Sequence, residues 1–155
     1  MFSKSFGYAL RGILVIVFLR NEKPRIHVDE IASLLSVPRF FMSKVLKNLA
    51  KQGILGSGKG PRGGFYVNEQ TISTTIFRVL MITDGDAHFR NCALQLNECN
   101  LQNPCPLHYH IVTVRNELKH LMESTTIDDL INGHNGEFLL SLSSQKSLKK
   151  IIPAL

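Results

Sequence analysis

Three cysteines and one histidine lie close together in the second half of this 155-residue chain. Cys92, Cys99 and Cys105 follow a C-x6-C-x5-C spacing, and His108 comes three residues after the last cysteine. Thiolates are soft ligands, so three of them on one short segment can converge on an iron–sulfur cluster or on zinc. The sequence therefore predicts a metal site formed by Cys92, Cys99, Cys105 and His108.

Other chemistry of the same cysteines stays open. They can remain free thiols, or two of them can form a reversible disulfide that responds to oxidation. Structural zinc is a further alternative, although zinc sites usually contain closer C-x2-C pairs. Three cysteines are an odd number and too few for a disulfide-stapled domain, so we expect a reducing, cytoplasmic location.

The elements around the cysteines must bring them together. Residues 87–106 have weak periodicity and are expected to form a loop, in which several asparagines can support turns. A long helix is expected from Pro106 or Leu107 to about Met122. Its apolar residues alternate at spacings of four and three, which is typical of helices that pair with another helix. These residues are Leu107, Ile111, Val114, Leu118 and Leu121.

Positive charge is concentrated in the first half of the chain. Residues 1–67 contain eleven Lys and Arg against three Asp and Glu, a net charge of +8, which suits contact with nucleic acid. The composition, 44% apolar and 19% charged, is that of a folded globular protein. The longest apolar run is Gly12–Leu19, which is far shorter than the ~20 residues of a membrane span, so we expect no membrane association.

The basic half carries the pattern of helices joined by a tight turn. Helices are expected over residues 4–19, 28–35 and 38–52, the first of them capped by Ser3. Ser36 can take the turn, Val37 is expected to be buried, Ala32 suits a close helix approach, and Gly53 suits a left-handed helix end. The buried stripe of the third helix is expected to comprise Phe41, Met42, Val45, Leu46 and Leu49.

A glycine-rich segment follows the third helix. Two short pieces with strand propensity, 54–55 and 65–67, flank Gly56–Gly64, whose five glycines are expected to form a flexible hairpin tip. Short helices are expected over 74–83 and 127–131. The predicted fold is mainly α with a small β-hairpin, a winged helix-turn-helix plus a long helix. Such a fold places its second motif helix in the major groove. The predicted DNA contacts are Arg39, Phe40, Ser43, Lys44, Lys47, Lys59 and Arg62.

These motifs together resemble those of the Rrf2 family of bacterial transcription regulators over about residues 1–133. The stretches that carry the resemblance are Tyr8–Arg11, Ile31–Leu49, Lys59–Phe65 and the three-cysteine loop. The resemblance implies a homodimer in which the long helix crosses its partner and each wing reaches one half-site of a double-stranded DNA operator. In cluster-binding members it also implies that the loop cysteines ligate an iron–sulfur cluster.

The chain departs from the family pattern at several positions. Lys59 and Phe65 stand where the wing of the family usually has arginine and tyrosine, and the first cysteine gap is one residue longer than in IscR-like members. Gly7 stands where NsrR-like members can have an acidic ligand. His108 matches the histidine of IscR-like members, so the resemblance favours a ligand set of three cysteines and one histidine. The cluster type stays open.

Three regions are expected: a winged helix-turn-helix over 1–68, a sensor loop and dimerisation helix over 69–133, and a C-terminal tail over 134–155. The expected function is sequence-specific transcription regulation that senses redox state, iron–sulfur status or nitric oxide. The alternatives are a regulator of the same fold without a cluster, which senses a metabolite or thiol oxidation, and a protein-interaction module with a basic face. No nucleophile–base pair, paired carboxylates or phosphate loop indicates an enzyme.

Overall fold

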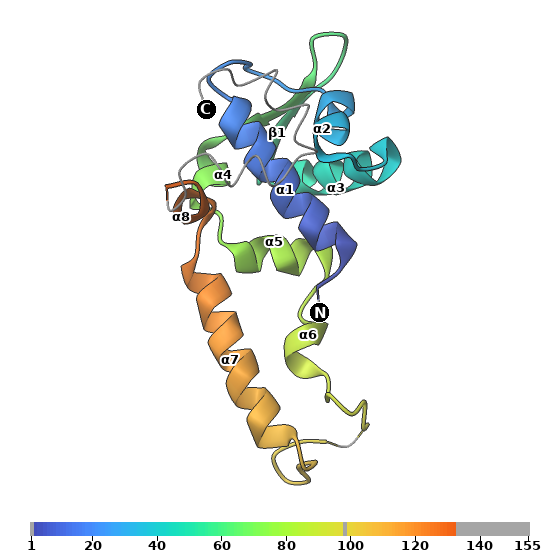
Figure 1. The fold of residues 1–155 in the computed structure, drawn as a ribbon, viewed down its shortest axis with the longest axis vertical. Helices are drawn as coiled ribbons and strands as arrows, with labels where there is room; N and C mark the ends of the chain where they lie inside the picture. The colour runs from blue at the N-terminus through green and yellow to red at the C-terminus, as the bar shows by residue number, and fades with distance from the viewer. Residues whose placement is uncertain (1, 98, 133–155) are drawn as a thin grey trace.

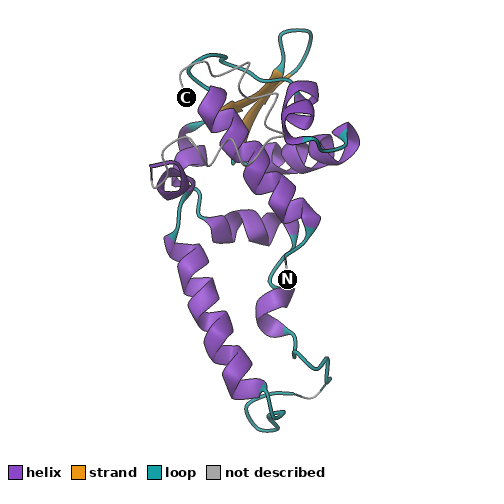
Figure 2. Ribbon diagram, viewed as in Figure 1, coloured by secondary structure: helices purple, strands orange, loops and turns teal. Residues whose placement is uncertain are grey.

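A computed structural model describes residues 2–97 and 99–132, so the expected tail over 134–155 lies outside the described residues. The described chain is mostly helical, with one two-stranded hairpin (Figures 1 and 2). Its elements are α1 (Lys4–Leu19), α2 (Val28–Leu35), α3 (Arg39–Lys51), β1 (Leu55–Gly58), β2 (Gly64–Val67), α4 (Glu69–Ser73), α5 (Ile76–Thr83), α6 (Ala87–Arg90), α7 (His108–Ser124) and α8 (Ile127–Asn132). None of the helices in the described residues combines the length and apolar character that a membrane span requires.

Helix α1 forms the centre of the core. The Ser3 hydroxyl accepts a hydrogen bond from the Phe6 backbone N–H at 3.1 Å, which confirms the predicted cap. The second half of the helix is apolar on nearly all sides and is buried, because α2, α3, α5 and β2 all pack against it. The hydrophobic core is therefore continuous from the helix-turn-helix to α5.

The turn between α2 and α3 forms as predicted. Ser36 adopts the left-handed conformation with φ 51°, and the N–H of Val37 donates to the carbonyl of Ala32 at 3.0 Å. Val37 and Ala32 are both buried. Gly53, with φ 78°, follows the end of α3, as expected for a left-handed helix end.

One residue of the predicted stripe on α3 is placed wrongly. Met42, Val45, Leu46 and Leu49 are buried, whereas Phe41 is 53% exposed. The buried residues recur at three and four positions, and Phe41 precedes the first of them, about 100° around the helix. Its ring lies against the Phe40 ring, with centroids 5.7 Å apart, so the first turn of α3 presents two neighbouring aromatic rings.

The hairpin is longer than the sequence predicts. β1 and β2 pair antiparallel from Leu55–Val67 to Gly58–Gly64, so the strand includes glycines that were expected to lie in the tip. Glycine is needed at position 56 of this strand, because a Cβ there would lie 2.1 Å from the ring of Tyr66. The strand therefore includes Gly56, which leaves room for that ring. A backbone bridge between Ile26 and Phe65 fastens β2 to the segment before α2.

Two short helices were not predicted. Asn68 caps α4 and forms a capping box with Thr71, whose buried hydroxyl donates to the carbonyl of Ile54 at 2.6 Å. The expected helix over 74–83 is therefore preceded by α4, and α5 begins only at Ile76. The expected loop over 87–106 begins with α6.

Helix α7 leaves the core as an arm. Figure 1 shows α6 and α7 extending away from the hairpin, with residues 91–107 joining their far ends. The C-terminal end of α7 is fixed to the core, because Ile76 N–H donates to the Thr125 carbonyl and Ile127 N–H donates to the Thr74 carbonyl, both at 2.9 Å. The expected helix over 127–131 is α8, which begins after Thr126.

Candidate metal centre and nucleic-acid interface

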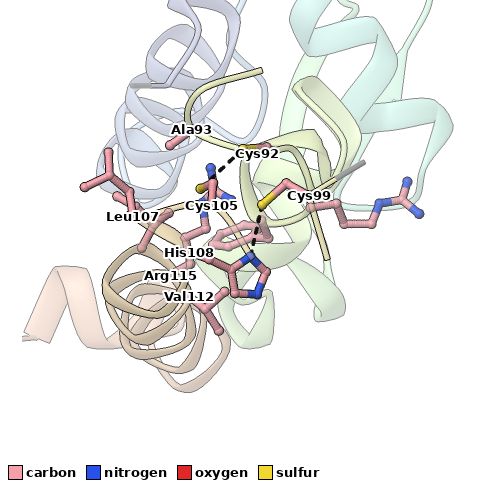
Figure 3. A pocket seen from close by; sticks show the side chains of 11 residues that line it. Cys92, Ala93, Cys99, Cys105, Leu107, His108, Val112 and Arg115 are labelled. Atoms are coloured by element: carbon pink, nitrogen blue, oxygen red, sulfur yellow. Dashed lines mark hydrogen bonds between the residues drawn. The ribbon is translucent and has the colours of Figure 1, made fainter. Parts of the chain in front are cut away.

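The four predicted metal ligands come from the segment that joins α6 to α7. Cys92 lies two residues after the end of α6, Cys99 lies in the middle of the loop, Cys105 lies three residues before α7, and His108 is the first residue of that helix. Figure 3 shows that their side chains point toward one another. The structure therefore brings together residues that are up to sixteen positions apart.

The ligand atoms are close. The three sulfur atoms all lie within 4.8 Å of one another, and the Sγ atoms of Cys92 and Cys105 are 3.9 Å apart. The Sγ of Cys99 lies 3.2 Å from Nδ1 of His108. All three cysteines are free thiols. This arrangement fits metal ligation: with bonds of ~2.3 Å, two thiolates on one tetrahedral metal ion lie roughly 3.8 Å apart.

Local turns produce this arrangement. The Cys105 carbonyl accepts the His108 N–H at 2.9 Å, which places both side chains at the start of α7. The Asn100 side chain accepts the N–H groups of Gln102 and Asn103 at 2.8 and 2.9 Å, which folds the loop back between Cys99 and Cys105. Among the asparagines expected to support turns, the side chain of Asn100 makes these turn hydrogen bonds.

The thiols differ in their tendency to ionise. A hydrogen bond from the Leu96 backbone is the largest of the contacts that lower the pKa of Cys92 to about 7, against the opposing effect of burial. The backbone of Cys105 also acts to lower the pKa of Cys99, but burial and the two neighbouring thiols outweigh it and raise that pKa. Cys92 is therefore more readily present as a thiolate than Cys99.

The surroundings of the thiols suit a negatively charged group. Arg90 and Arg115 line the same pocket, and Arg90 is held by a 2.6 Å ion pair with Asp86. Nε2 of His108 is buried and has no hydrogen-bond partner in the described part of the chain. A buried imidazole nitrogen without a hydrogen-bond partner is costly, and Nδ1 of the same ring is the nitrogen that faces the thiols. The donor set and its surroundings therefore fit a thiolate-ligated metal.

The predicted DNA contacts lie at the other end of the molecule from the cysteines (Figure 1). On α3, Arg39, Phe40, Lys44 and Lys47 are exposed and Ser43 is half-buried, with Phe40 72% exposed. On the hairpin tip, Lys59 and Arg62 are exposed on either side of a turn closed by a 2.9 Å hydrogen bond from Gly63 to Gly60.

Sequence reasoning missed three residues at this surface. Asp29 of α2 is paired with Arg39, and Arg25 places its guanidinium 5.2 Å from the centre of the Tyr66 ring on the hairpin. Phe41, expected in the core, lies beside Phe40. The sequence does show opposite charges at Asp29, in the first turn of α2, and at Arg39, the first residue of α3. Only the geometry of the turn between these helices shows that the two side chains meet.

The apolar stripe predicted to form a dimer divides into two sets. Leu107, Val114 and Leu121 are exposed, with Val114 and Leu121 60% and 59% exposed. Leu118 instead packs against the core of its own chain, and Leu107 and Ile111 line the cysteine pocket. Val114 and Leu121 are therefore left uncovered on α7, and three of the five predicted residues already have partners within the chain.

A helix-turn-helix followed by a paired-strand wing defines a winged-helix DNA-binding protein. The profile of the family Rrf2, described as an iron-dependent transcriptional regulator, matches residues 2–133. The chain belongs to this Rrf2 family of transcriptional regulators, and the resemblance inferred from the motifs is confirmed. Its family consists of regulators and not enzymes, which favours DNA binding over a protein-interaction module.

Individual relatives agree with this assignment. The chain is 33% identical over 135 residues to an HTH-type transcriptional regulator of Aquifex aeolicus, covering 85% of this chain and 92% of that protein. It is 26% identical over 125 residues to the HTH-type transcriptional regulator NsrR of Geobacillus kaustophilus, covering 80% and 84%. The solved structure of CymR, the global cysteine regulator of B. subtilis, matches with a TM-score of 0.70 at 16% identity, over 87% of this chain and 98% of that one, which shows a shared fold.

Proposed function

We propose that this regulator binds its operator as a homodimer and senses redox state, iron–sulfur status or nitric oxide through an iron–sulfur cluster. Cys92, Cys99, Cys105 and His108 are its proposed ligands. The observation that carries the proposal is the convergence of three thiols within 4.8 Å of one another, beside the ring of His108. When bound, such a cluster supplies a group that changes oxidation state and reacts with oxidants or nitric oxide.

The chain's own residues connect this site to the rest of the molecule. His108 is the first residue of α7, and Cys92 follows α6, so both helices begin or end at the ligand set. Any change in how these side chains are held alters the start of α7 and the end of α6. The exposed Leu107, Val114 and Leu121 on α7 are the proposed dimer contacts, and a shift of α7 would change the spacing of two wings across the dimer.

The proposed DNA-reading set is the one predicted from the sequence. Arg39, Phe40, Ser43, Lys44 and Lys47 project from α3, and Lys59 and Arg62 from the hairpin tip. Arginine and lysine bind phosphates and guanine edges, and the exposed ring of Phe40 is the proposed contact for a thymine methyl group. Since neither half of the chain contributes a membrane-spanning helix among the described residues, we propose the cytoplasm as its location.

A structural zinc ion is the second candidate for the cysteine site. The 3.9 Å separation between Cys92 and Cys105 is close to the roughly 3.8 Å expected for two thiolates on a single tetrahedral ion, and His108 offers a fourth ligand. In that case the loop would be a fixed element, and the regulator would sense a metabolite at another site.

Anaerobic purification followed by visible absorption and by iron, sulfide and zinc analysis of one sample tests these candidates. The proposal predicts a brown protein with iron and sulfide, and loss of the absorption in Cys92→Ala and His108→Ala. His110→Ala is the matched control, because His110 is exposed on the same helix two residues further on and should leave the absorption unchanged. A colourless protein with stoichiometric zinc would establish the second candidate, and a colourless, metal-free protein would contradict both.

A further inference from the structure

An ion pair joins the two helices of the helix-turn-helix on its exposed side. Nε of Arg39, the first residue of α3, donates a hydrogen bond to Oδ1 of Asp29, in the first turn of α2. Both side chains are 64% exposed. An exposed ion pair contributes little to stability. The turn is also fixed independently by the left-handed Ser36 and the buried Val37, so the fold does not account for this pair.

The pair leaves a specific part of Arg39 available. Because Arg39 bonds to Asp29 through Nε, both of its terminal amino groups remain available for other acceptors. Among the described residues, the Arg39 side chain makes no other hydrogen bond. Those two groups form the planar fork that matches O6 and N7 of guanine. The first residues of a recognition helix are the ones that reach base edges in the major groove.

Holding the side chain in advance also favours binding. A free arginine has many rotamers, and ordering it on DNA opposes association. Asp29 already restricts these rotamers in the unbound protein. Its carboxylate also offsets the unfavourable position of a cation at the N-terminus of a helix. An acidic residue beside the DNA-facing helix repels phosphates, so general attraction to DNA does not account for the position of Asp29 next to Arg39.

We propose that Asp29 is a positioning residue that sets Arg39 to read one guanine in the operator. This inference rests on the proposed DNA-binding function. It assigns to Asp29 a role in sequence discrimination and not in the general attraction to phosphates. The probe is a duplex operator selected from a random pool by the wild-type protein, together with copies in which each G·C pair is replaced in turn by A·T.

The chain supplies a matched control. Glu30 is the neighbouring acid in the same turn of α2, but it pairs with Lys23 in the preceding loop and not with α3. Glu30→Ala and Asp29→Ala remove the same charge from almost the same place, so their effects on general attraction to phosphates should be alike. Only Asp29→Ala should alter the reading of a base.

The expected result is specific. Arg39→Ala should lose about tenfold or more of the preference for one guanine, and Asp29→Ala should lose roughly tenfold at the same position. Both Asp29→Ala and Glu30→Ala should keep or increase affinity for non-operator DNA. A double-mutant cycle should show coupling between Asp29 and Arg39 on the operator and none on the copy that lacks that guanine.

Two results would overturn the inference while the proposed function stands. In one, Asp29→Ala changes affinity for every duplex by the same factor as Glu30→Ala; in the other, Arg39→Ala alters the preference for no guanine. A wild-type protein that selects no sequence from the pool would instead overturn DNA reading itself, and this inference with it. Asp29→Asn keeps the shape of the side chain. If Asp29→Ala fails to fold, the Asp29→Asn variant should still show a weaker preference for the guanine. An Asp29→Asn variant with an unchanged guanine preference would count against the proposal.

Discussion

The carboxylate of Asp84 accepts a hydrogen bond from the backbone N–H of Ser3 at 2.8 Å and a second one from the Ser3 hydroxyl. Asp84 follows the last residue of α5, and Ser3 caps α1. The same carboxylate lies 3.3 Å from Nε2 of His88 on α6. One side chain therefore connects the start of the core helix, the end of α5 and the short helix that leads to Cys92.

Replacing Asp84 by alanine should destabilise the protein by about 1–3 kcal/mol, because the donors of Ser3 and His88 lose a charged acceptor that they share. The Asp84 side chain is only 2% exposed, so water replaces the carboxylate poorly. Urea unfolding followed by circular dichroism measures this. Asp86→Ala is the control, since Asp86 pairs with the exposed Arg90 and its loss should cost much less.

Because of the Asp84 carboxylate, the stability of the folded protein should decrease at acidic pH. Partial burial opposes ionisation of Asp84, but the hydrogen bonds from Ser3 outweigh it and hold the pKa below the ordinary value of 3.8. A carboxyl whose pKa is lowered by folding stabilises the protein above its unfolded pKa, and this contribution disappears as the pH falls through the lower, folded value. In thermal melts from pH 6 down to pH 3, the melting temperature of Asp84→Asn should fall less than that of the wild type. Equal decreases in the two melting temperatures would contradict the prediction.

Gly64→Ala should detach the wing from the core. Gly64 has φ 132°, and a Cβ there would lie 2.6 Å from the Ile26 carbonyl oxygen, which belongs to rigid backbone. The strain, on the order of 1–3 kcal/mol, acts on the bridge between Ile26 and Phe65. We expect a lower melting temperature and weaker binding to DNA. Gly7→Ala is the control, because a Cβ at Gly7 meets no atom within 4 Å and should be neutral or stabilising.

Val114→Glu should separate the proposed dimer without unfolding the chain. The side chain is 60% exposed in the monomer, so a charge is tolerated there until a second copy covers it. Sedimentation should show a monomer with an unchanged circular dichroism spectrum. Asn116→Glu, on an exposed polar position of the same helix, should leave the dimer intact. A wild-type protein that is already monomeric would contradict the proposed α7 interface.

Replacing both Lys59 and Arg62 by alanine should weaken binding to operator and to unrelated DNA by similar factors. Cations at a hairpin tip act mainly through phosphates or through minor-groove width, so each one lost should reduce the slope of log affinity against log salt by about 1. Titrations at several salt concentrations measure this slope. The charge control is Lys119→Ala on α7, whose ammonium lies over the Phe77 ring and should not alter the slope.

Local signals predicted the helix-turn-helix well. Ser36 forms the turn, Val37 is buried and Gly53 takes the left-handed helix end, as their positions in the pattern indicated. Phe41 was placed wrongly because its apolar character outweighed its position at the edge of the stripe. The short helix α4 was missed because its cap, Asn68 with Thr71, involves a tertiary contact to Ile54 that periodicity does not register.

The residues of the cysteine site could be predicted from the sequence, but their arrangement in space could not. Three thiols on one loop indicate convergence, yet the turn at Asn100 and the hydrogen bond from His108 to Cys105 decide how they converge. The pair of Asp29 and Arg39 was not predicted at all. These residues are ten positions apart, and only the conformation of Ser36 brings them within reach.

The attachment of the cysteine loop to α6 and α7 has a thermodynamic consequence. Under the proposed function, the state of the cysteine site changes affinity for the operator by some factor. Linkage then requires that the operator change the affinity of the cysteine site for its metal by the same factor. DNA is therefore both the target of this regulator and an effector of its metal site. Regulators bound to promoters should hold their metal with a different affinity from regulators free in the cell.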